Sequence, residues 1–302
     1  RILAVLYALP VSSRLPATWL CNPLRNVELC TTVPTAMLFS LALTAVASSP
    51  SKLSSSKVGP ALKLRGGGVS AADAQTVVAG LMGLSSGIGY VYTDDMAKLY
   101  EFTDPVTPQT KFMSKMTFGS NAAAAVLLLK PEYFVVAMAG VVYSLADQAG
   151  EVLDMPRYPM VAFAILPLVI EWAMAQGHLP KWALGAFLMT HGAASILAWE
   201  VTLGDLATIL PIYSLYQAKV KSTKQSECVG KFFIGNLLAQ GIYLVSQANG
   251  HTAAQSFGYW ATAMTAAGVK FALVDGKGVF NPAGGYVWIA LYAAAAGIAL
   301  TA

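Results

Sequence analysis

Long runs of apolar residues separated by short polar connections dominate the chain after Val69. Eight such runs occur, at residues 76–92, 114–129, 132–147, 159–177, 182–200, 231–247, 257–275 and 283–301. A helix needs about 20 apolar residues to cross a hydrocarbon core about 30 Å thick. The second and third runs are shorter, so either their flanking charged side chains reach the interface or the two form one re-entrant hairpin. The pattern predicts an all-α polytopic membrane protein with eight transmembrane helices.

Part of this pattern occurs twice. The sequence AGVVYSLAD at residues 139–147 returns as AGVKFALVD at 267–275, an offset of 128 positions. Shorter matches link 80–82 to 187–189 and 115–119 to 231–235, at offsets of 107 and 116. An offset that grows along the chain is expected when the second copy has longer loops. We therefore predict two parallel four-helix repeats, 73–178 and 179–302, related by an axis along the membrane normal.

Composition and charge support a membrane location. Hydrophobic residues make up 56% of the chain and charged residues 11%, which is too few charges for the surface of a soluble protein. From Val69 onward there are 12 basic and 14 acidic residues, so this part carries no basic excess that would indicate nucleic-acid binding. The expected partner is the lipid bilayer, with an oligomer or a larger membrane complex as a further possibility.

The basic residues are also unevenly distributed between the two predicted sides of the membrane. Ten lie in loops on one side and two, Lys130 and Lys181, on the other. Because loops rich in Lys and Arg stay in the cytosol, the connections 93–113 and 201–230 are expected on the cytosolic side or its equivalent. Both mature termini then lie on the opposite side.

The first 72 residues have a different character. Residues 37–48 combine a short apolar core with small residues, as a secretory signal peptide does. We hypothesise that Met37 is the initiator and that residues 1–36 are untranslated upstream sequence; a longer N-terminus is the alternative. Residues 49–72 are expected to be a targeting segment or linker, since 49–68 contain no acidic residue and few apolar ones.

The segment KLRGG at residues 63–67, following a signal peptide, resembles the bipartite presequences of algae with secondary plastids. That resemblance implies a plastid membrane. In a thylakoid, however, the basic loops would be stromal and the N-terminus would need a further translocation step. An endomembrane location is therefore favoured, with a plastid membrane as the alternative.

Two ionisable residues fall inside predicted spans, where such residues are functional candidates. Glu171 lies six residues before the connection at Gly177, which is about 9 Å along a helix. His191 lies nine residues into the next span, which is about 14 Å. Consecutive spans are antiparallel neighbours, so the two side chains are expected to meet and bind a ligand. The alternatives are that both only satisfy packing, or that His191 ligates a pigment or metal.

Asp147 and Asp275 close the two copies of the repeated sequence. A carboxylate at the C-terminal end of a helix faces the negative end of the helix dipole, which is unfavourable unless something else uses it. They are therefore candidates for a symmetric pair of cation or proton ligands. The alternative is that each starts the following turn and pairs with Arg157 or Lys277.

Other polar residues in the spans carry a structural prediction. Asn121, Asn236 and Gln240 are expected to hydrogen-bond between helices. The cysteines, Cys21, Cys30 and Cys228, have no metal or redox spacing, and no hydrolase, nucleotide-binding or metalloprotease motif occurs. We therefore expect no metal site and no catalytic residues, and the sequence leaves any cofactor unidentified.

Each four-span unit, with an aspartate closing its third span, resembles the DoxX-like four-helix membrane proteins. Those proteins are functionally heterogeneous, so the resemblance implies architecture rather than activity. The first hypothesis is a carrier or a protein that binds small molecules or ions between the two repeats. The alternatives are a structural subunit of a larger membrane assembly, possibly a photosynthetic one, and a membrane enzyme of lipid or isoprenoid metabolism.

Overall fold

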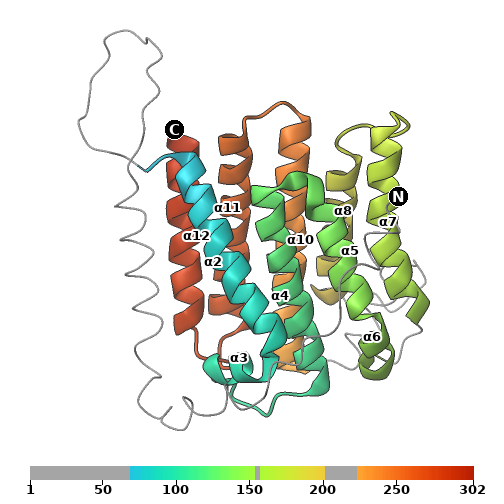
Figure 1. Cartoon of the computed structure of the whole chain (residues 1–302). Coiled ribbons are helices and arrows are strands. Elements are labelled where there is room, and N and C mark those ends of the chain that lie inside the picture. The colour runs from blue at the N-terminus through green and yellow to red at the C-terminus, as the bar shows by residue number, and fades with distance from the viewer. Residues whose placement is uncertain (1–68, 154–156, 201–222) are drawn as a thin grey trace, which may run out of the picture. The chain divides into compact units, whose positions relative to one another are not determined.

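The computed structural model describes residues 69–153, 157–200 and 223–302, all within one compact unit (Figure 1). Its helices are α2 (Ala71–Val91), α3 (Thr93–Leu99), α4 (Pro108–Leu129), α5 (Phe134–Ser144), α6 (Ala146–Leu153), α7 (Arg157–Ala175), α8 (Ala183–Glu200), α10 (Lys224–Ala248), α11 (Ala253–Val269) and α12 (Ala283–Thr301). A 3-10 turn, η2 (Pro131–Tyr133), precedes α5, and a π-helix, η4 (Lys270–Asp275), continues α11. The described residues form no strand, which confirms the all-α prediction for this part of the chain.

Each of the eight predicted spans corresponds to helix. Three described helices are long and apolar enough to cross a membrane by length and composition: α4, α10 and α12. A shorter apolar helix occupies Met160–Ala175 within α7. The predicted segments 1–36 and 37–48, most of 49–72, and residues 201–222 of the predicted connection lie outside the described residues.

The helices begin at polar caps that the apolar pattern did not reveal. The Thr107 and Thr223 hydroxyls each accept a hydrogen bond from the backbone N–H three residues later, at 3.2 Å, and so start α4 and α10. These starts come six and seven residues before the predicted starts at 114 and 231. The first turns are polar but buried, because Thr110 and Gln225 lie against each other between the two helices, with side-chain oxygens 3.5 Å apart.

The third predicted span, 132–147, is not one helix. It is divided into η2, α5 and α6, with a break after Ser144. The Ser144 hydroxyl donates to the Val141 carbonyl at 2.7 Å, and it lies 2.7 Å from the Tyr90 hydroxyl of α2. A serine hydroxyl that bonds back to its own helix tends to bend the helix. Leu145 and Ala146 follow and are fully buried, so the chain turns inward there.

The helices α4 and α10 lie at the centre. The buried share of the apolar window is 78% in α4 and 61% in α10, against 28% in α12. On one side α2 and α5 pack on α4, and α7 packs on α5; on the other, α8 and α11 pack on α10, and α12 packs on α11. The outer helices meet as well, α12 on α2 and α7 on α8. These contacts among the long helices of the first half therefore have counterparts in the second half.

The two central helices run in the same direction. Thr117 donates to the Val229 carbonyl at 3.3 Å, Asn236 to Asn121 at 2.8 Å and Gln240 to the Ser120 carbonyl at 3.1 Å. The sequence separations of these pairs are 112, 115 and 120, so they stay nearly constant along the helix axes. Antiparallel helices would instead give separations that change by several residues at each turn.

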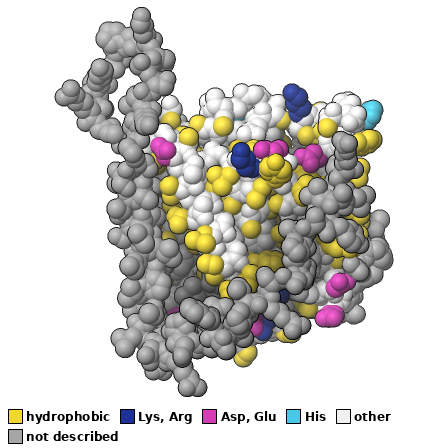
Figure 2. Space-filling view, viewed as in Figure 1, with side chains coloured by type: hydrophobic (Ala, Val, Ile, Leu, Met, Phe, Trp, Pro, Cys, Tyr) yellow, Lys and Arg dark blue, Asp and Glu magenta, His cyan; other side chains and the backbone are white. Residues whose placement is uncertain are grey.

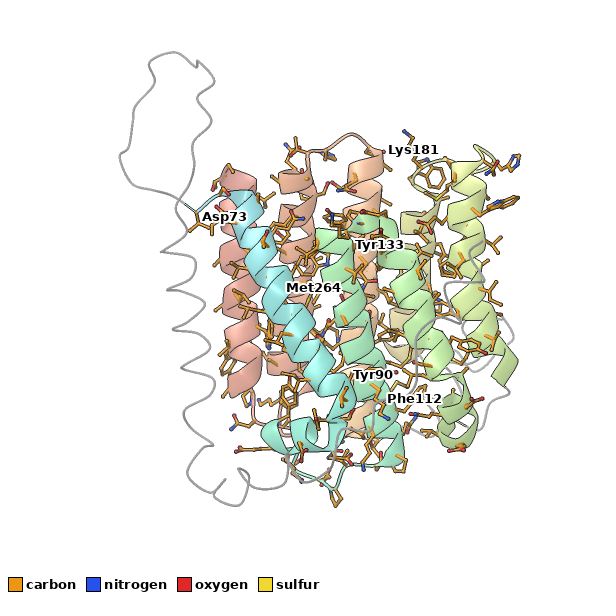
Figure 3. The ribbon with its side chains drawn as sticks, viewed as in Figure 1. Asp73, Tyr90, Phe112, Tyr133, Lys181 and Met264 are labelled. Atoms are coloured by element: carbon orange, nitrogen blue, oxygen red, sulfur yellow. The ribbon has the colours of Figure 1, made fainter. Side chains whose placement is uncertain are left out.

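Charged residues gather at the two ends of the bundle. Figure 3 places Asp73, Tyr133 and Lys181 at one end and Tyr90 and Phe112 at the other. In the space-filling view, the visible Lys, Asp and Glu side chains lie near these ends, and the described surface between them is hydrophobic or uncharged (Figure 2). Such a band is expected of a bundle whose sides face lipid.

Close packing of α8 on α10 depends on two glycines. A Cβ added to Gly241 would lie 2.5 Å from Met189 Cγ and 2.7 Å from the Gly185 carbonyl oxygen, whereas one added to Gly80 of α2 would have no neighbour within 4 Å. We expect Gly241→Ala to lower the free energy of unfolding by about 1–3 kcal/mol because the helices must separate. Gly80→Ala should raise it by up to about 1 kcal/mol through helix propensity. Thermal unfolding of both variants in detergent measures the difference; equal effects would contradict this view of the packing.

Candidate functional site

The structure does not bring Glu171 and His191 together. The His191 ring packs on Phe163, with ring centroids 4.6 Å apart, and lies 6.2 Å from the Phe187 ring. Phe163 is eight residues from Glu171, which is about 12 Å along α7. Glu171 lies four residues from the end of α7, but His191 lies eight residues from the start of α8, so the two residues lie at different depths. The expectation of a Glu171–His191 site is therefore corrected: each residue lies in its own surroundings.

The two repeated aspartates also differ from expectation. Asp147 does not end a helix, because α5 stops at Ser144 and Asp147 lies exposed in the first turn of α6. A carboxylate in a first turn is favoured by the helix dipole, so Asp147 needs no bound cation there. Asp275 ends η4 and pairs with Lys270 at 2.9 Å rather than with the predicted Lys277. The proposed role of these two residues as symmetric ligands stays a prediction.

Asp275 belongs to a largely buried cluster of four charges where α10 meets η4. Lys231 lies 3.0 Å from Glu227 and 3.8 Å from Asp275, and the side chains of Lys231 and Asp275 are 13% and 11% exposed. The π-helix brings Lys270 beside Asp275 because its turn spans about five residues. Among the residues that the structure describes, two cations face two anions in this cluster, so these four charges balance one another.

A buried amide cluster joins α4 to α10, as predicted for Asn121, Asn236 and Gln240. The Asn236 side chain donates to Ser120 Oγ at 3.0 Å and to Asn121 Oδ1 at 2.8 Å, and Gln240 donates to Ser120 Oγ at 3.0 Å. Asn236 and Gln240 are fully buried. Within the described part of the chain, Gln240 Oε1 has no hydrogen-bond partner. The cluster therefore holds the two halves together and has one buried acceptor to spare.

A cavity of about 70 Å³ lies beside this cluster, between α2 and α4 on one side and α10 to α12 on the other. Six aromatic side chains line it: Tyr100, Phe118, Phe232, Phe271, Trp288 and Tyr292. Tyr100, from the connection after α3, is mostly buried, and burial raises the pKa of its phenol. The cavity is therefore apolar, aromatic and shared by both halves of the bundle.

Besides the Tyr and Trp side chains, three polar side chains line this cavity: Ser85, Ser86 and Asn121. The Ser85 hydroxyl donates to the Met82 carbonyl of its own helix at 3.1 Å. Among the described residues, the Ser86 hydroxyl has no hydrogen-bond partner, and Asn121 only accepts one, through Oδ1. One hydroxyl and one amide NH₂ group are thus available to a molecule in the cavity.

Sequence reasoning missed this cavity. Its lining comes from six helical segments and one connection, and no two of its aromatic residues are adjacent in sequence. Ser85 and Ser86 read as small residues that allow close helix contact, which is their usual role in membrane helices. The remaining sequence signal was Asn121, whose polar side chain in an apolar run marked an internal position.

The structure also lacks a convergent set of metal ligands in the part that it describes. No group of three or more His, Cys, Asp or Glu side chains lies close enough there to hold a metal ion. Cys228 is buried as a free thiol, and its Sγ lies 3.8 Å from the Phe271 carbonyl oxygen.

The charge cluster is expected to contribute to the free energy of unfolding. Lys231→Gln would leave Glu227 and Asp275 with Lys270 as the remaining cation of the cluster, so we expect a loss of about 3 kcal/mol in the free energy of unfolding. Lys98→Gln removes one side of an exposed ion pair, Lys98–Asp95, with side chains 79% and 69% exposed, and should cost less than about 1 kcal/mol. Thermal unfolding compares the two, and a Lys231→Gln variant as stable as Lys98→Gln would rule out this role.

Comparison with models of known protein families, with curated proteins and with solved structures gave no match to this chain. The resemblances to DoxX-like proteins and to plastid presequences therefore stay predictions. The function has to be inferred from the residues and their contacts.

Proposed function

We propose that this chain is an integral membrane protein with eight transmembrane helices in two similar four-helix units, and that it binds or carries a small apolar molecule between them. The observation that carries the proposal is the aromatic cavity beside the amide cluster, with lining from both halves and with unused hydrogen-bond donors. A concave, mostly apolar site with a few polar groups is the usual form of a small-molecule site.

The paired helix contacts support the proposal of two repeats. If 73–178 and 179–302 are copies, α2, α4, α5 and α7 correspond to α8, α10, α11 and α12. The contacts of α2 with α4 and α8 with α10 are then equivalent, and so are those of α12 with α2 and α7 with α8. The nearly constant separation of partners across the α4–α10 contact, close to the sequence offset of 116, is what an axis parallel to the helices requires. Ligand sites between parallel repeats are a common plan among carriers.

The unused donors indicate the polar group of the ligand. Asn121 and Ser86 can each donate a hydrogen bond into the cavity, and an unmade bond at a buried polar group costs about 1–3 kcal/mol. A molecule that supplies a carbonyl, ether or hydroxyl oxygen removes that cost. We therefore propose a ligand with an apolar or aromatic body and one acceptor oxygen.

The cavity is smaller than such a ligand. A volume of about 70 Å³ matches about two water molecules, at roughly 30 Å³ each. Binding therefore requires side chains of the lining or whole helices to move apart, and the structure corresponds to a closed state in this proposal. Gly268 of α11 and Gly285 of α12 line the cavity and lack side chains that would block such a movement.

The lining argues against an enzyme. Of the cavity residues that the structure describes, none is a carboxylate, histidine, lysine or cysteine. General acid–base and nucleophilic catalysis usually rely on such groups. A binding or carrier role is therefore the better match, while a subunit role in a larger complex rests on partners that remain to be found.

Two serines that line the same cavity provide a matched test of ligand binding. The protein is purified from its own membrane, and native mass spectrometry then identifies any retained molecule. We expect one with an acceptor oxygen, bound about two- to tenfold more weakly by Ser86→Ala because one hydrogen bond is lost. Ser85→Ala should bind normally, since that hydroxyl already bonds within α2. Equal affinities for both variants, or purification with stoichiometric protein partners and no small molecule, would refute the binding proposal.

The eight-span topology has a separate test. Single cysteines are placed at Lys98 and Lys277, on the predicted cytosolic side, and at Lys130 and Lys181, on the other side, in a background in which Cys21, Cys30 and Cys228 are replaced by Ser. In sealed vesicles a membrane-impermeant thiol reagent should label one pair and spare the other. Labelling that divides Lys98 from Lys277 would exclude parallel four-span repeats.

A further inference from the structure

A second and larger cavity, with a different lining from the aromatic cavity, opens at the α3 end of the first half. It has a volume of about 600 Å³ and lies between the end of α2, α3, the start of α4 and α6. We call it the end groove. Its lining is amphipathic: Val91, Phe112 and Val152 are apolar, and Lys115, Gln148 and Glu151 are among the polar residues.

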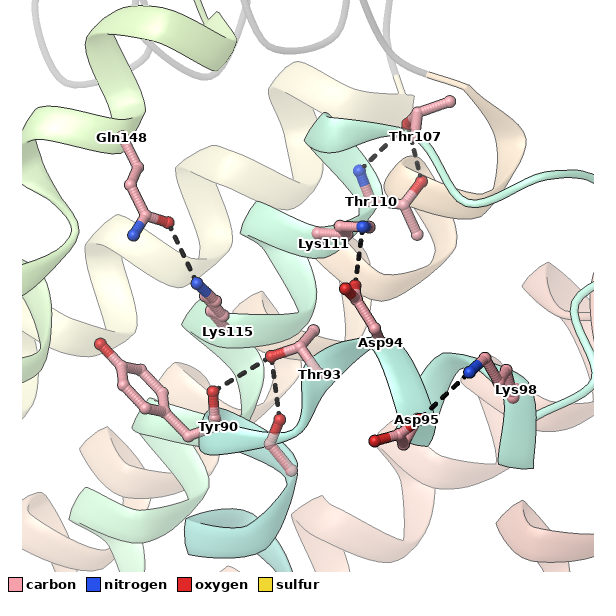
Figure 4. Close-up of polar contacts among 11 residues, drawn as sticks. Tyr90, Thr93, Asp94, Asp95, Lys98, Thr107, Thr110, Lys111, Lys115 and Gln148 are labelled. Carbon is pink, nitrogen blue, oxygen red and sulfur yellow. Dashed lines mark hydrogen bonds and ion pairs between the residues drawn. The ribbon is translucent and has the colours of Figure 1, made fainter. Parts of the chain in front are cut away.

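Two ion pairs in the end groove neutralise most of its charge (Figure 4). Lys111 lies 2.7 Å from Asp94, and Lys98 lies 3.2 Å from Asp95. The hydrogen bond from Lys111, with smaller contributions from nearby lysines, holds the pKa of Asp94 below its ordinary value, so this pair stays ionised. These four residues therefore leave no net charge for a ligand.

Lys115 is in a different situation. It is half-buried, and in the described part of the chain its one hydrogen bond goes to Gln148 Oε1 at 3.5 Å, at the outer limit for such a bond (Figure 4). Lys115 interacts electrostatically with Asp94 but forms no direct ion pair with a described residue, and a partly buried ammonium group without such a pair has lost part of its hydration. The end groove therefore contains a cation that an anionic group of a ligand would stabilise.

In the second half, the equivalent lysine pairs with acidic residues of the chain itself. Lys231 follows Lys115 by the offset of 116 positions that separates the starts of α10 and α4. It pairs with Glu227 at 3.0 Å and Asp275 at 3.8 Å. Lys115 has Lys111 one turn earlier, at the position that corresponds to Glu227, and the neutral Gln148 as its hydrogen-bond acceptor. Lys231 therefore has two carboxylate partners, whereas Lys115 has a lysine and a neutral amide at these places, and an anion from outside the protein could pair with it.

An anion alone would not complete the end groove. Glu151 is exposed, and it has no hydrogen bond or ion pair with the residues that the structure describes. It lies three residues after Gln148 on α6, so its side chain is a neighbour of Gln148 on one helix face, with Cβ atoms about 5–6 Å apart. The end groove therefore contains a cation, Lys115, and an anion, Glu151, that form no direct ion pair with the described residues, and Gln148 is a neighbour of both.

The position of the end groove fits a lipid. Lys115 is seven residues into α4, about 10 Å from its start, and it is the second residue of the apolar run 114–129. A lysine at the edge of an apolar run lies at the depth of the lipid headgroups. The apolar lining from Val91, Phe112 and Val152 then lies where the start of an acyl chain would lie.

We propose that the end groove binds the headgroup of a zwitterionic phospholipid, with the phosphate on Lys115 and the ammonium group on Glu151. This site is separate from the aromatic cavity and does not depend on what that cavity binds. It does depend on the protein lying in a membrane, with this end of the bundle at the headgroup level.

The test uses purified protein in an uncharged maltoside detergent, because zwitterionic detergents would compete. Native mass spectrometry measures binding of short-chain phosphatidylcholine and of the phosphatidylglycerol with the same chains, each with and without inorganic phosphate. The wild-type protein should bind phosphatidylcholine more tightly, and millimolar phosphate should displace it poorly. Lys115→Gln should weaken both lipids about three- to tenfold, through loss of one charge-assisted contact.

Two further variants separate a zwitterion site from a general anion site. Glu151→Gln should remove the preference for phosphatidylcholine and bind phosphatidylglycerol at least as well as before. Lys98→Gln is the control, since Lys98 lies on the same end but is already paired with Asp95. Unchanged binding by Lys115→Gln overturns the proposal, as does a wild-type preference for phosphatidylglycerol or for free phosphate. Thermal unfolding of each variant shows that altered binding is not a folding defect.

Discussion

The contact between α4 and α10 is the interaction on which the rest of this structure depends. Two parallel, mostly buried helices are joined by side-chain amides, with Asn236 and Gln240 of one helix bonded to Ser120 and Asn121 of the other. In surroundings of low polarity an unmade hydrogen bond is costly, so these amides specify both the pairing and the register of the helices. The remaining helices then add to this pair from the outside, in equivalent positions on the two sides.

The aromatic cavity is a consequence of the same contact. Asn121 uses its oxygen for Asn236, so its NH₂ group is left facing the space between the halves. Bulky rings from α4, α10, η4 and α12 surround that space without filling it. The proposed binding site thus lies where a cavity remains between the two halves, and sites between repeats are a common plan among carriers.

The two halves have similar helix contacts but use their charges differently. In the second half, Glu227, Lys231, Lys270 and Asp275 neutralise one another and close the end of the bundle. In the first half, Lys115 occupies the position of Lys231 but donates to a neutral amide, and a cavity opens beside it. The two ends therefore differ in chemistry. The end of the second half contains ion pairs between its own residues, whereas the end groove of the first half contains charged side chains that a ligand could contact.

The sequence by itself determined the helical class, the approximate place of the apolar helices except for the broken third one, and the bonding of Asn121, Asn236 and Gln240 between helices. Apolar periodicity and run length depend on neighbours in the chain, and a rare amide in an apolar run has few alternatives to a partner across a helix contact. Tertiary structure decided the rest. His191 packs on Phe163 instead of meeting Glu171, Asp275 pairs with Lys270 and Lys231, and Ser86 faces a cavity, because each depends on helix depth and on residues over a hundred positions away. Depth and rotation are set by how helices pack on one another, and a single helix does not carry that information.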